Sequence, residues 1–141
     1  MKFLNEQGQE ITLKRAENLP GYEVMLSEDV VIDSAVNNPF FKGINILQLP
    51  KKLKGFRDNP DLRMLFEPQI LSTGIQLNLN DNMFGIFEPD SVLTTENRLF
   101  LINHSFGNSQ IINPKFVNFG LKKVHLKKGS VIGTLMIIES R

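Results

Sequence analysis

Short runs of alternating apolar and polar residues, separated by turn-forming residues, occur along almost the whole chain. Residues 75–79 (Ile-Gln-Leu-Asn-Leu) alternate strictly, and Val24, Leu26, Val30 and Ile32 share one parity. Such alternation is typical of strands with one buried face. Similar apolar runs lie at residues 11–13, 83–87, 99–102, 111–112, 115–117, 124–126 and 131–138. Many short strands with little helical periodicity predict a mainly β domain, which would be a sandwich, a jelly roll or a small barrel.

Turn-forming residues separate several of these runs. Asp81 and Asn82 precede residues 83–87, which we interpret as the return strand of a hairpin with residues 75–79. Residues 127–130 (Lys-Lys-Gly-Ser) predict a tight turn before an apolar closing strand. The glycines here lack the following lysine of a phosphate-binding loop and lead into a strand, so a hairpin turn is favoured.

Residues 37–68 differ from the rest, because they contain four prolines and a cluster of basic residues. Within them, residues 61–66 predict one or two turns of helix. We therefore predict a single domain over residues 1–141 with an insertion at 37–68. Long excursions from a sheet usually contact a partner or cover a site, although a lysine-rich solvated loop is the simpler alternative. The candidate partner-contact residues are Phe40, Phe41, Lys51, Lys52, Lys54, Phe56 and Arg57.

Composition excludes several classes of function. A net charge of +1 gives no overall field, so a nucleic-acid partner is not indicated. The absence of cysteine excludes disulfides, zinc–thiolate sites and a cysteine nucleophile. Residues 1–6 turn polar at once and no apolar run approaches the roughly 20 residues of a membrane span, so neither a secretion signal nor a membrane segment is expected. A cytoplasmic and a virion location both remain compatible with the sequence.

The residues that could carry catalysis form no complete set. His104 and His125 are far apart and neither has a carboxylate at ligand spacing, so no metal site is predicted. No serine lies in a Gly-x-Ser-x-Gly elbow. Glu88 and Asp90 flank Pro89 and should share a face of a strand. They could bind a divalent cation, but polar residues at the end of a strand are the favoured interpretation.

Residues 20–24, 28–32 and 72–77 together resemble segments of one known family, the trimeric dUTP pyrophosphatases (dUTPases). Residues 20–24 (Pro-Gly-Tyr-Glu-Val) resemble the family's Ala-Gly-Tyr-Asp-Leu segment, and residues 28–32 (Glu-Asp-Val-Val-Ile) resemble the Asp-Val-Val-Ile strand after it. Residues 72–77 (Ser-Thr-Gly-Ile-Gln-Leu) resemble its Pro-Thr-Gly-Ile strand. These segments follow one another in the family's order.

The second part of the chain continues the resemblance. Residues 85–93 are similar to the family's Gly-Arg-Ile-Ala-Pro-Arg-Ser-Ser-Leu segment. Asn118 and residues 126–135 resemble its closing Asn and its Ile-Lys-Arg-Gly-Asp-Arg-Ile-Ala-Gln-Leu segment. Outside residues 37–68 and the first dozen or so, the resemblance covers most of the chain. It implies a jelly-roll-like β domain that forms a homotrimer with sites between the subunits.

The sequence departs from this family at the positions of its chemistry. The phosphate-binding Arg that precedes Ser falls on Asp90, next to Ser91, and a carboxylate there would repel a triphosphate. The Asp that activates the attacking water is expected near His104 or Ser105, yet the interval from Ser91 to Gly129 contains no Asp. Losing both groups would remove most of the barrier reduction, so we expect no dUTP hydrolysis.

Other family positions differ as well. The aromatic residue that packs the deoxyribose would fall near Asn108, and Thr134 replaces the Gln of the closing segment. Glu23 keeps a carboxylate where the family has an Asp near magnesium. The residual nucleotide-site positions implied by the resemblance are Glu23, Asp90, Ser91 and His104.

Two function classes follow. The favoured one is a non-catalytic homotrimeric structural or binding module, with no cofactor, whose partners are itself and a larger protein assembly, such as a viral capsid that it decorates, or a host protein. The alternative is a divergent magnesium-dependent nucleotide pyrophosphatase, for which Glu23, Glu88, Asp90 and His104 are the candidate magnesium ligands and base.

Overall fold

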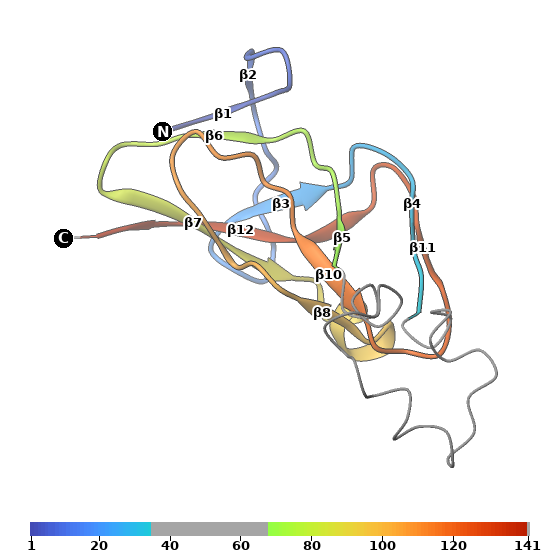
Figure 1. Ribbon diagram of the computed structural model, residues 1–141. Coiled ribbons are helices and arrows are strands. Elements are labelled where there is room, and N and C mark those ends of the chain that lie inside the picture. Colours follow the sequence, from blue (N-terminus) through green and yellow to red (C-terminus); the bar gives the residue numbers. More distant parts are fainter. Residues whose placement is uncertain (35–67, 141) are drawn as a thin grey trace, which may run out of the picture.

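Strands make up most of the regular structure. The computed structural model describes residues 1–34 and 68–140, and Figure 1 shows how their strands are arranged. The strands are β1 (Lys2–Leu4), β2 (Glu10–Ile11), β3 (Tyr22–Met25), β4 (Val30–Ile32), β5 (Gln69–Ile70), β6 (Gln76–Asn78), β7 (Met83–Pro89), β8 (Leu99–Leu101), β9 (Ser105–Phe106), β10 (Lys115–Asn118), β11 (Val124–Leu126) and β12 (Val131–Glu139). No helix among the described residues is long and apolar enough to span a bilayer.

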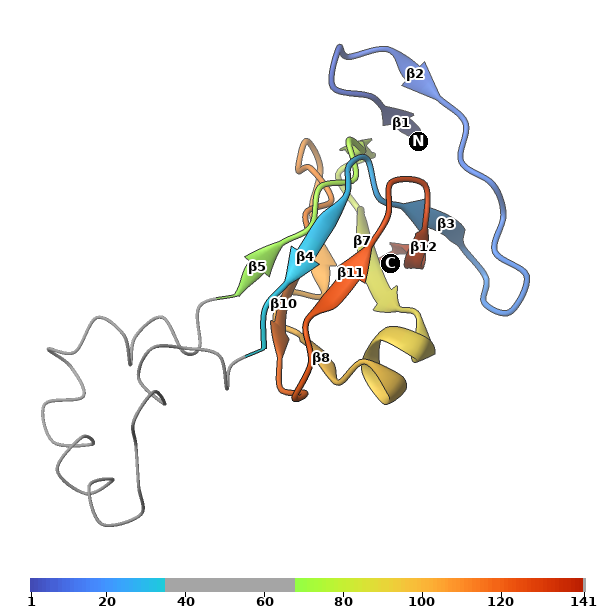
Figure 2. The same cartoon turned by 90° about the vertical axis from the view of Figure 1, so that its right-hand side faces the viewer.

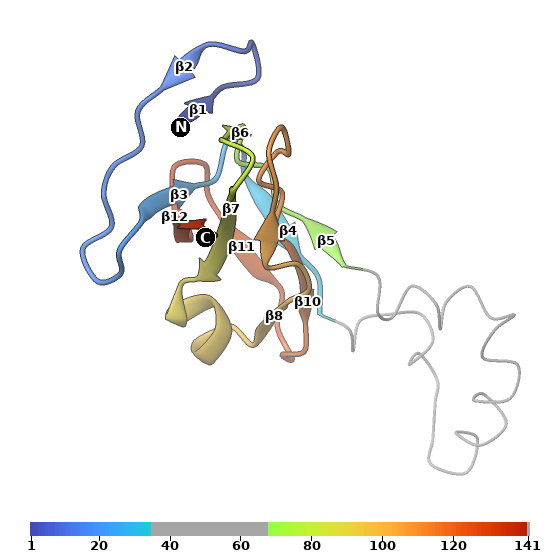
Figure 3. The same cartoon turned by 90° about the vertical axis from the view of Figure 1, so that its left-hand side faces the viewer.

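The strands form small antiparallel sheets that surround one core. Their orders are β2-β1-β6, β5-β10-β8, β11-β4 and β3-β12-β7-β9. In Figures 2 and 3, β5 and β3 lie on opposite sides of the molecule with β7 between them. The β5-β10-β8 sheet and the β3-β12-β7-β9 sheet are thus two separate sheets of the domain.

The core is built from the alternating apolar residues. Ile75, Leu77 and Leu79 are buried, as are Val24, Leu26 and Ile32. Phe87, Phe116 and Leu135 are fully buried at the centre, and each buried side chain of this size contributes roughly 1.5–3 kcal/mol. The predicted mainly β fold and its inward-facing parity are thus confirmed.

Two pairings differ from the sequence prediction. Residues 76–78 and 83–89 do form strands, and Met83 N donates to Asn80 O in the turn between them. They are not a hairpin, however, since β6 pairs with β1 whereas β7 pairs with β12 and β9. The 127–130 turn is present, with a Ser130 N to Lys127 O hydrogen bond, but it likewise joins strands of different sheets. Alternation fixes which side chains face the core and leaves the choice of partner strand to long-range packing.

A short helix, η3 (Val92–Glu96), follows β7 and was not predicted. Asn97 N donates to Val92 O five residues earlier at 3.0 Å, and Leu93 N donates to Asp90 O at 3.0 Å. Leu93 points into the core with 4% exposure. Its β-branched neighbours carry little helical signal, so burial of Leu93 is the stabilising contribution. The helix predicted at 61–66 lies outside the described residues.

Strand β12 needs a glycine where it packs most closely. A Cβ atom on Gly133 would lie 2.4 Å from the Glu88 carbonyl oxygen and 2.5 Å from the Phe87 ring. Only a residue without a side chain allows β12 and β7 to approach in this way. Gly133 therefore fixes the register in which Thr134 lies opposite Glu88.

Candidate functional site

Two acidic residues lie in one row across the β3-β12-β7 sheet. Thr134 on β12 pairs with Glu23 on β3 and with Glu88 on β7. Directly opposed residues of antiparallel strands share a face, so all three side chains point away from the core, because their neighbours Leu135 and Phe87 point into it. The Thr134 hydroxyl group therefore has one carboxylate on each side of it, from Glu23 and from Glu88.

Glu23 is held from its own side of the sheet. The Lys14 Nζ lies 3.9 Å from a Glu23 carboxylate oxygen, and Glu23 N donates to Lys14 O at 2.8 Å. Lys14 has a largely exposed side chain, so the ion pair contributes well under about 1 kcal/mol. Its local effect is to balance the charge of Glu23, whereas Glu88 is exposed and forms no ion pair with any described residue.

Asp90 and Ser91 lie at the junction of β7 and η3. Asp90 N donates to Ile132 O at 2.8 Å, and its carbonyl accepts hydrogen bonds from Leu93 N and Thr94 N. Ser91 precedes the helix without a side-chain capping bond. The backbone of both residues thus serves to end the strand and begin the helix.

His104 lies beside β7 through its backbone. Its carbonyl accepts a hydrogen bond from Phe87 N at 2.8 Å, and its side chain is exposed. The structure therefore brings Glu23, Glu88 and Thr134 into one row, and places Asp90, Ser91 and His104 around the end of the same strand.

The described acidic residues and histidines do not fit a metal centre. Among residues 1–34 and 68–140, no three His, Cys, Asp or Glu side chains are positioned to hold one ion. A hard cation such as Mg²⁺ requires several oxygen ligands that converge. The two carboxylates of the row are instead separated by the intervening strand β12.

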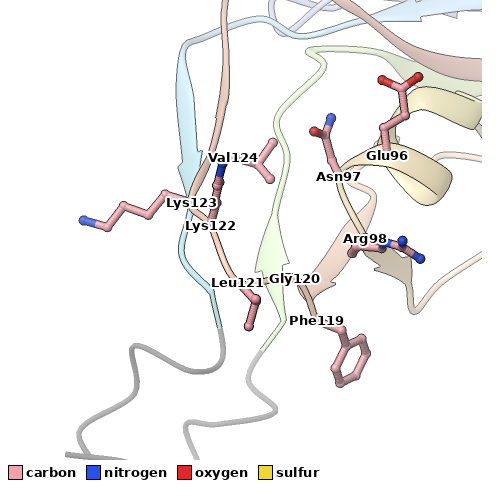
Figure 4. Close-up of a pocket in the computed structure, with 9 residues that line it drawn as sticks. All are labelled: Glu96, Asn97, Arg98, Phe119, Gly120, Leu121, Lys122, Lys123 and Val124. Atoms are coloured by element: carbon pink, nitrogen blue, oxygen red, sulfur yellow. The ribbon is translucent and has the colours of Figure 1, made fainter.

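A different region contains an open pocket of about 790 Å³. It is lined by residues 96–98 and 119–124, and Figure 4 shows these side chains. Arg98 has φ +57°, which is uncommon for a residue with a side chain. In Figure 4 the Arg98 and Lys123 side chains point away from each other, so these cations do not converge on one anion.

Exposed apolar side chains are the feature that sequence reasoning missed. Phe100 and Phe119 form an edge-to-face pair with ring centroids 6.1 Å apart, while 58% and 55% of these residues are exposed. Ile70, Ile102 and Leu121 are also exposed. Of these residues, only Phe100 and Ile102 lie in a run that was predicted as a strand (residues 99–102), and the register of β8 against β10 shows that they face outward. The predicted partner-contact residues Phe40, Phe41, Lys51, Lys52, Lys54, Phe56 and Arg57 lie outside the described residues.

Solved structures share this arrangement. EIAV dUTPase superposes with a TM-score of 0.63 at 14% sequence identity, over 98% of this chain and 87% of that one. The fold is that of the dUTPases. A variant dUTPase of Staphylococcus bacteriophage 80alpha with dUpNHpp gives a TM-score of 0.62 at 11% identity, over 93% of this chain and 77% of that one.

A further dUTPase with this fold comes from phage phi11 of S. aureus. Its variant, described as coordinating a structural Mg(II) ion, has a TM-score of 0.62 at 10% identity, over 93% of this chain and 84% of that one. No protein-family model and no curated protein matches the chain. The likeness confirms the predicted dUTPase-type fold, and the function has to be argued from this chain's own residues.

Proposed function

We propose that the protein is a non-catalytic homotrimeric binding module built on the dUTPase fold. The observation that supports this most is the exposure of apolar side chains on two different sheets. Phe100, Phe119 and Ile70 are more than half exposed on one sheet, and Ile138 is 38% exposed on the other. Extended apolar surfaces of this kind on a soluble domain mark contacts with other proteins.

The charges around the end of β7 support the absence of catalysis. Glu88 and Asp90 are two residues apart there, and Glu23 lies in the same row as Glu88. Three carboxylates oppose the approach of a triphosphate unless cations balance them, and Arg is the residue that usually clamps such a group. A site of this composition suits protein contacts better than phosphate transfer.

A relative with this fold provides a precedent for a role beyond hydrolysis. The dUTPase of Staphylococcus bacteriophage 80alpha is described as controlling transfer of virulence genes by a proto-oncogenic G protein-like mechanism. The dUTPase fold is therefore compatible with a binding role that requires no hydrolysis of a nucleotide. In its narrower form, the proposal is that the trimer decorates a viral capsid or joins another large assembly, which immunogold labelling of intact virions would test.

The alternative function is a divergent magnesium-dependent nucleotide pyrophosphatase. It is favoured by the 80alpha dUTPase structures that hold dUpNHpp. In this protein, Glu23, Glu88, Asp90 and His104 would have to serve as ligands and base.

Two measurements test these functions together. Size-exclusion chromatography with light scattering should give the mass of three chains, each of 16.0 kDa. Isothermal titration with dUpNHpp and Mg²⁺ should give no heat of binding, and dUTP should remain intact at high concentrations of the protein. A monomer at micromolar concentration would contradict the trimer, and micromolar binding with turnover would establish the alternative.

A further inference from the structure

The outer surface of the β5-β10-β8 sheet is apolar around a single lysine. Phe116 pairs with Leu101 and Gln69, so Lys115 lies between Ile70 on one side and Ile102 on the other. Val117 pairs with Phe100 in the next row, and Phe119 packs against Phe100. We call this surface the Phe100 face; it comprises Ile70, Phe100, Ile102, Lys115, Val117 and Phe119.

The Phe100 face is separate from the core of its own subunit. Leu101 and Phe116 on the same strands point inward and are buried, whereas Phe100 is 58% exposed. Val117 is buried yet does not belong to the core cluster of the described residues. An exposed aromatic pair beside aliphatic residues has the composition of the centre of a protein–protein interface.

The outward cross-strand pairs of β12 and β7 are mostly apolar, and Glu88 is the one carboxylate among them. These pairs are Ile138 with Phe84, Met136 with Ile86, and Thr134 with Glu88. We call this surface the Glu88 face; it comprises Phe84, Ile86, Glu88, Thr134, Met136 and Ile138. Leu135 and Phe87, which alternate with these residues, fill the core, and none of the six joins the core cluster of described side chains.

The two faces are alike in their apolar composition and opposite in charge. Each is the outer surface of a sheet, each carries at least three large apolar side chains, and each has one charged residue among its six. Lys115 is the cation of the Phe100 face and Glu88 is the anion of the Glu88 face. Glu23, the other acid in the Glu88 row, is balanced by Lys14.

We infer that the Phe100 face of one copy of the chain binds the Glu88 face of a second copy. This inference rests on the proposed homotrimer and specifies how it is built. Contact between two identical Phe100 faces would bring Lys115 toward Lys115, and contact between two Glu88 faces would bring Glu88 toward Glu88. Contact between unlike faces pairs Lys115 with Glu88 and buries both apolar surfaces.

When unlike faces bind each other, both faces of every subunit are used only if the subunits close into a ring. A head-to-tail contact closes into a ring if its rotation permits and otherwise continues as a filament. A ring of three leaves no Phe100 face and no Glu88 face exposed. The trimer therefore accounts for both apolar surfaces with a single kind of contact.

The test uses two variants, each of which damages one face. Phe100→Asp spoils the Phe100 face and leaves the Glu88 face intact, and Met136→Asp does the reverse. By size-exclusion chromatography with light scattering, wild type should be a trimer and each variant alone a monomer. An equimolar mixture should give the mass of two chains and no more, because only one intact contact can form.

Charge reversal tests the pairing of Lys115 with Glu88. Lys115→Glu and Glu88→Lys should each weaken assembly by at least about tenfold, and the double variant should regain most of the affinity. Circular dichroism spectra that match wild type show that the variants still fold. Glu28→Lys, a charge reversal at an exposed residue on neither face, is the matched control and should leave the trimer intact.

The outcomes separate this inference from the proposed function. A wild-type trimer that persists in both Phe100→Asp and Met136→Asp overturns the inference and leaves the homotrimer standing, with the Phe100 face then assigned to another occupant. A mixture of the two variants that stays monomeric also overturns it. A wild-type monomer contradicts the proposed homotrimer itself.

Discussion

Asn118 offers a sharp test of how the fold supports the surface that carries Phe119. Asn118 is 2% exposed at the end of β10. Its Nδ2 donates to Ile32 O at 3.1 Å and to Lys122 O at 2.9 Å, and its Oδ1 accepts from Gly120 N at 2.8 Å. One side chain thus joins β10 to β4 and closes the turn that leads into β11.

Asn118→Ala removes all three hydrogen bonds from a buried site. At about 1 kcal/mol for each bond, the free energy of unfolding should fall by about 3 kcal/mol, and more if the freed backbone groups stay dry. Asn118→Asp keeps the acceptor for Gly120 N and loses both donors, so it should be at least as damaging at neutral pH. Urea unfolding followed by far-UV circular dichroism at one fixed protein concentration measures the change, because assembly would otherwise add to it.

Asn103→Ala is the matched control for this measurement. Asn103 also bridges two backbone groups, accepting from Lys115 N at 2.7 Å and donating to Asn113 O at 3.1 Å, but it is only half-buried. Water can replace part of its bonding, so a loss of about 1 kcal/mol is expected. If Asn118→Ala costs no more than Asn103→Ala, the reasoning that burial makes these bonds important is refuted.

Three further changes have clear expected outcomes. Gly133→Ala should destabilise by about 3 kcal/mol, because its Cβ would meet the Glu88 carbonyl at 2.4 Å, and Gly107→Ala, with its nearest atom at 3.9 Å, should be nearly neutral in the same urea titration. Phe87→Ala should lower the free energy of unfolding, measured by calorimetry, by about 3–5 kcal/mol; a loss below about 1 kcal/mol would contradict the place of Phe87 in the core. Lys14→Ala should change stability by less than about 0.5 kcal/mol, since the pair at 3.9 Å is solvated, and a larger thermal shift would contradict this.

The core was predictable from sequence because period-two alternation directly encodes burial. Residues 75–79 illustrate this, since each apolar member is buried around Leu77. The closing strand at 131–138 was likewise visible as one apolar run and is β12 in the structure. The dUTPase-type fold was predictable from the order of several segments that each resemble the family only weakly. No single motif would have been enough for this prediction.

Strand pairing and the candidate site were harder to predict from the sequence. The juxtaposition of Glu23 and Glu88 depends on the register of β12 against two strands that are distant in sequence, so local pattern gives no signal for it. The outward position of Phe100 depends in the same way on which strand parity faces the core. The η3 helix escaped prediction because Thr94 and its neighbours have low helix propensity and the contact of Leu93 is tertiary.

The position of β12 also determines when the domain can form. This strand comes later in the chain than β3 and β7, yet it lies between them and pairs with β7 from Gly133 through Glu139. During synthesis, β3 and β7 cannot join one sheet until β12 has been made, and until then each presents an open edge that can recruit another chain. Such long-range closure makes folding slow. A nascent chain of this protein should therefore depend on a chaperone more than a domain whose sheets close as they are made.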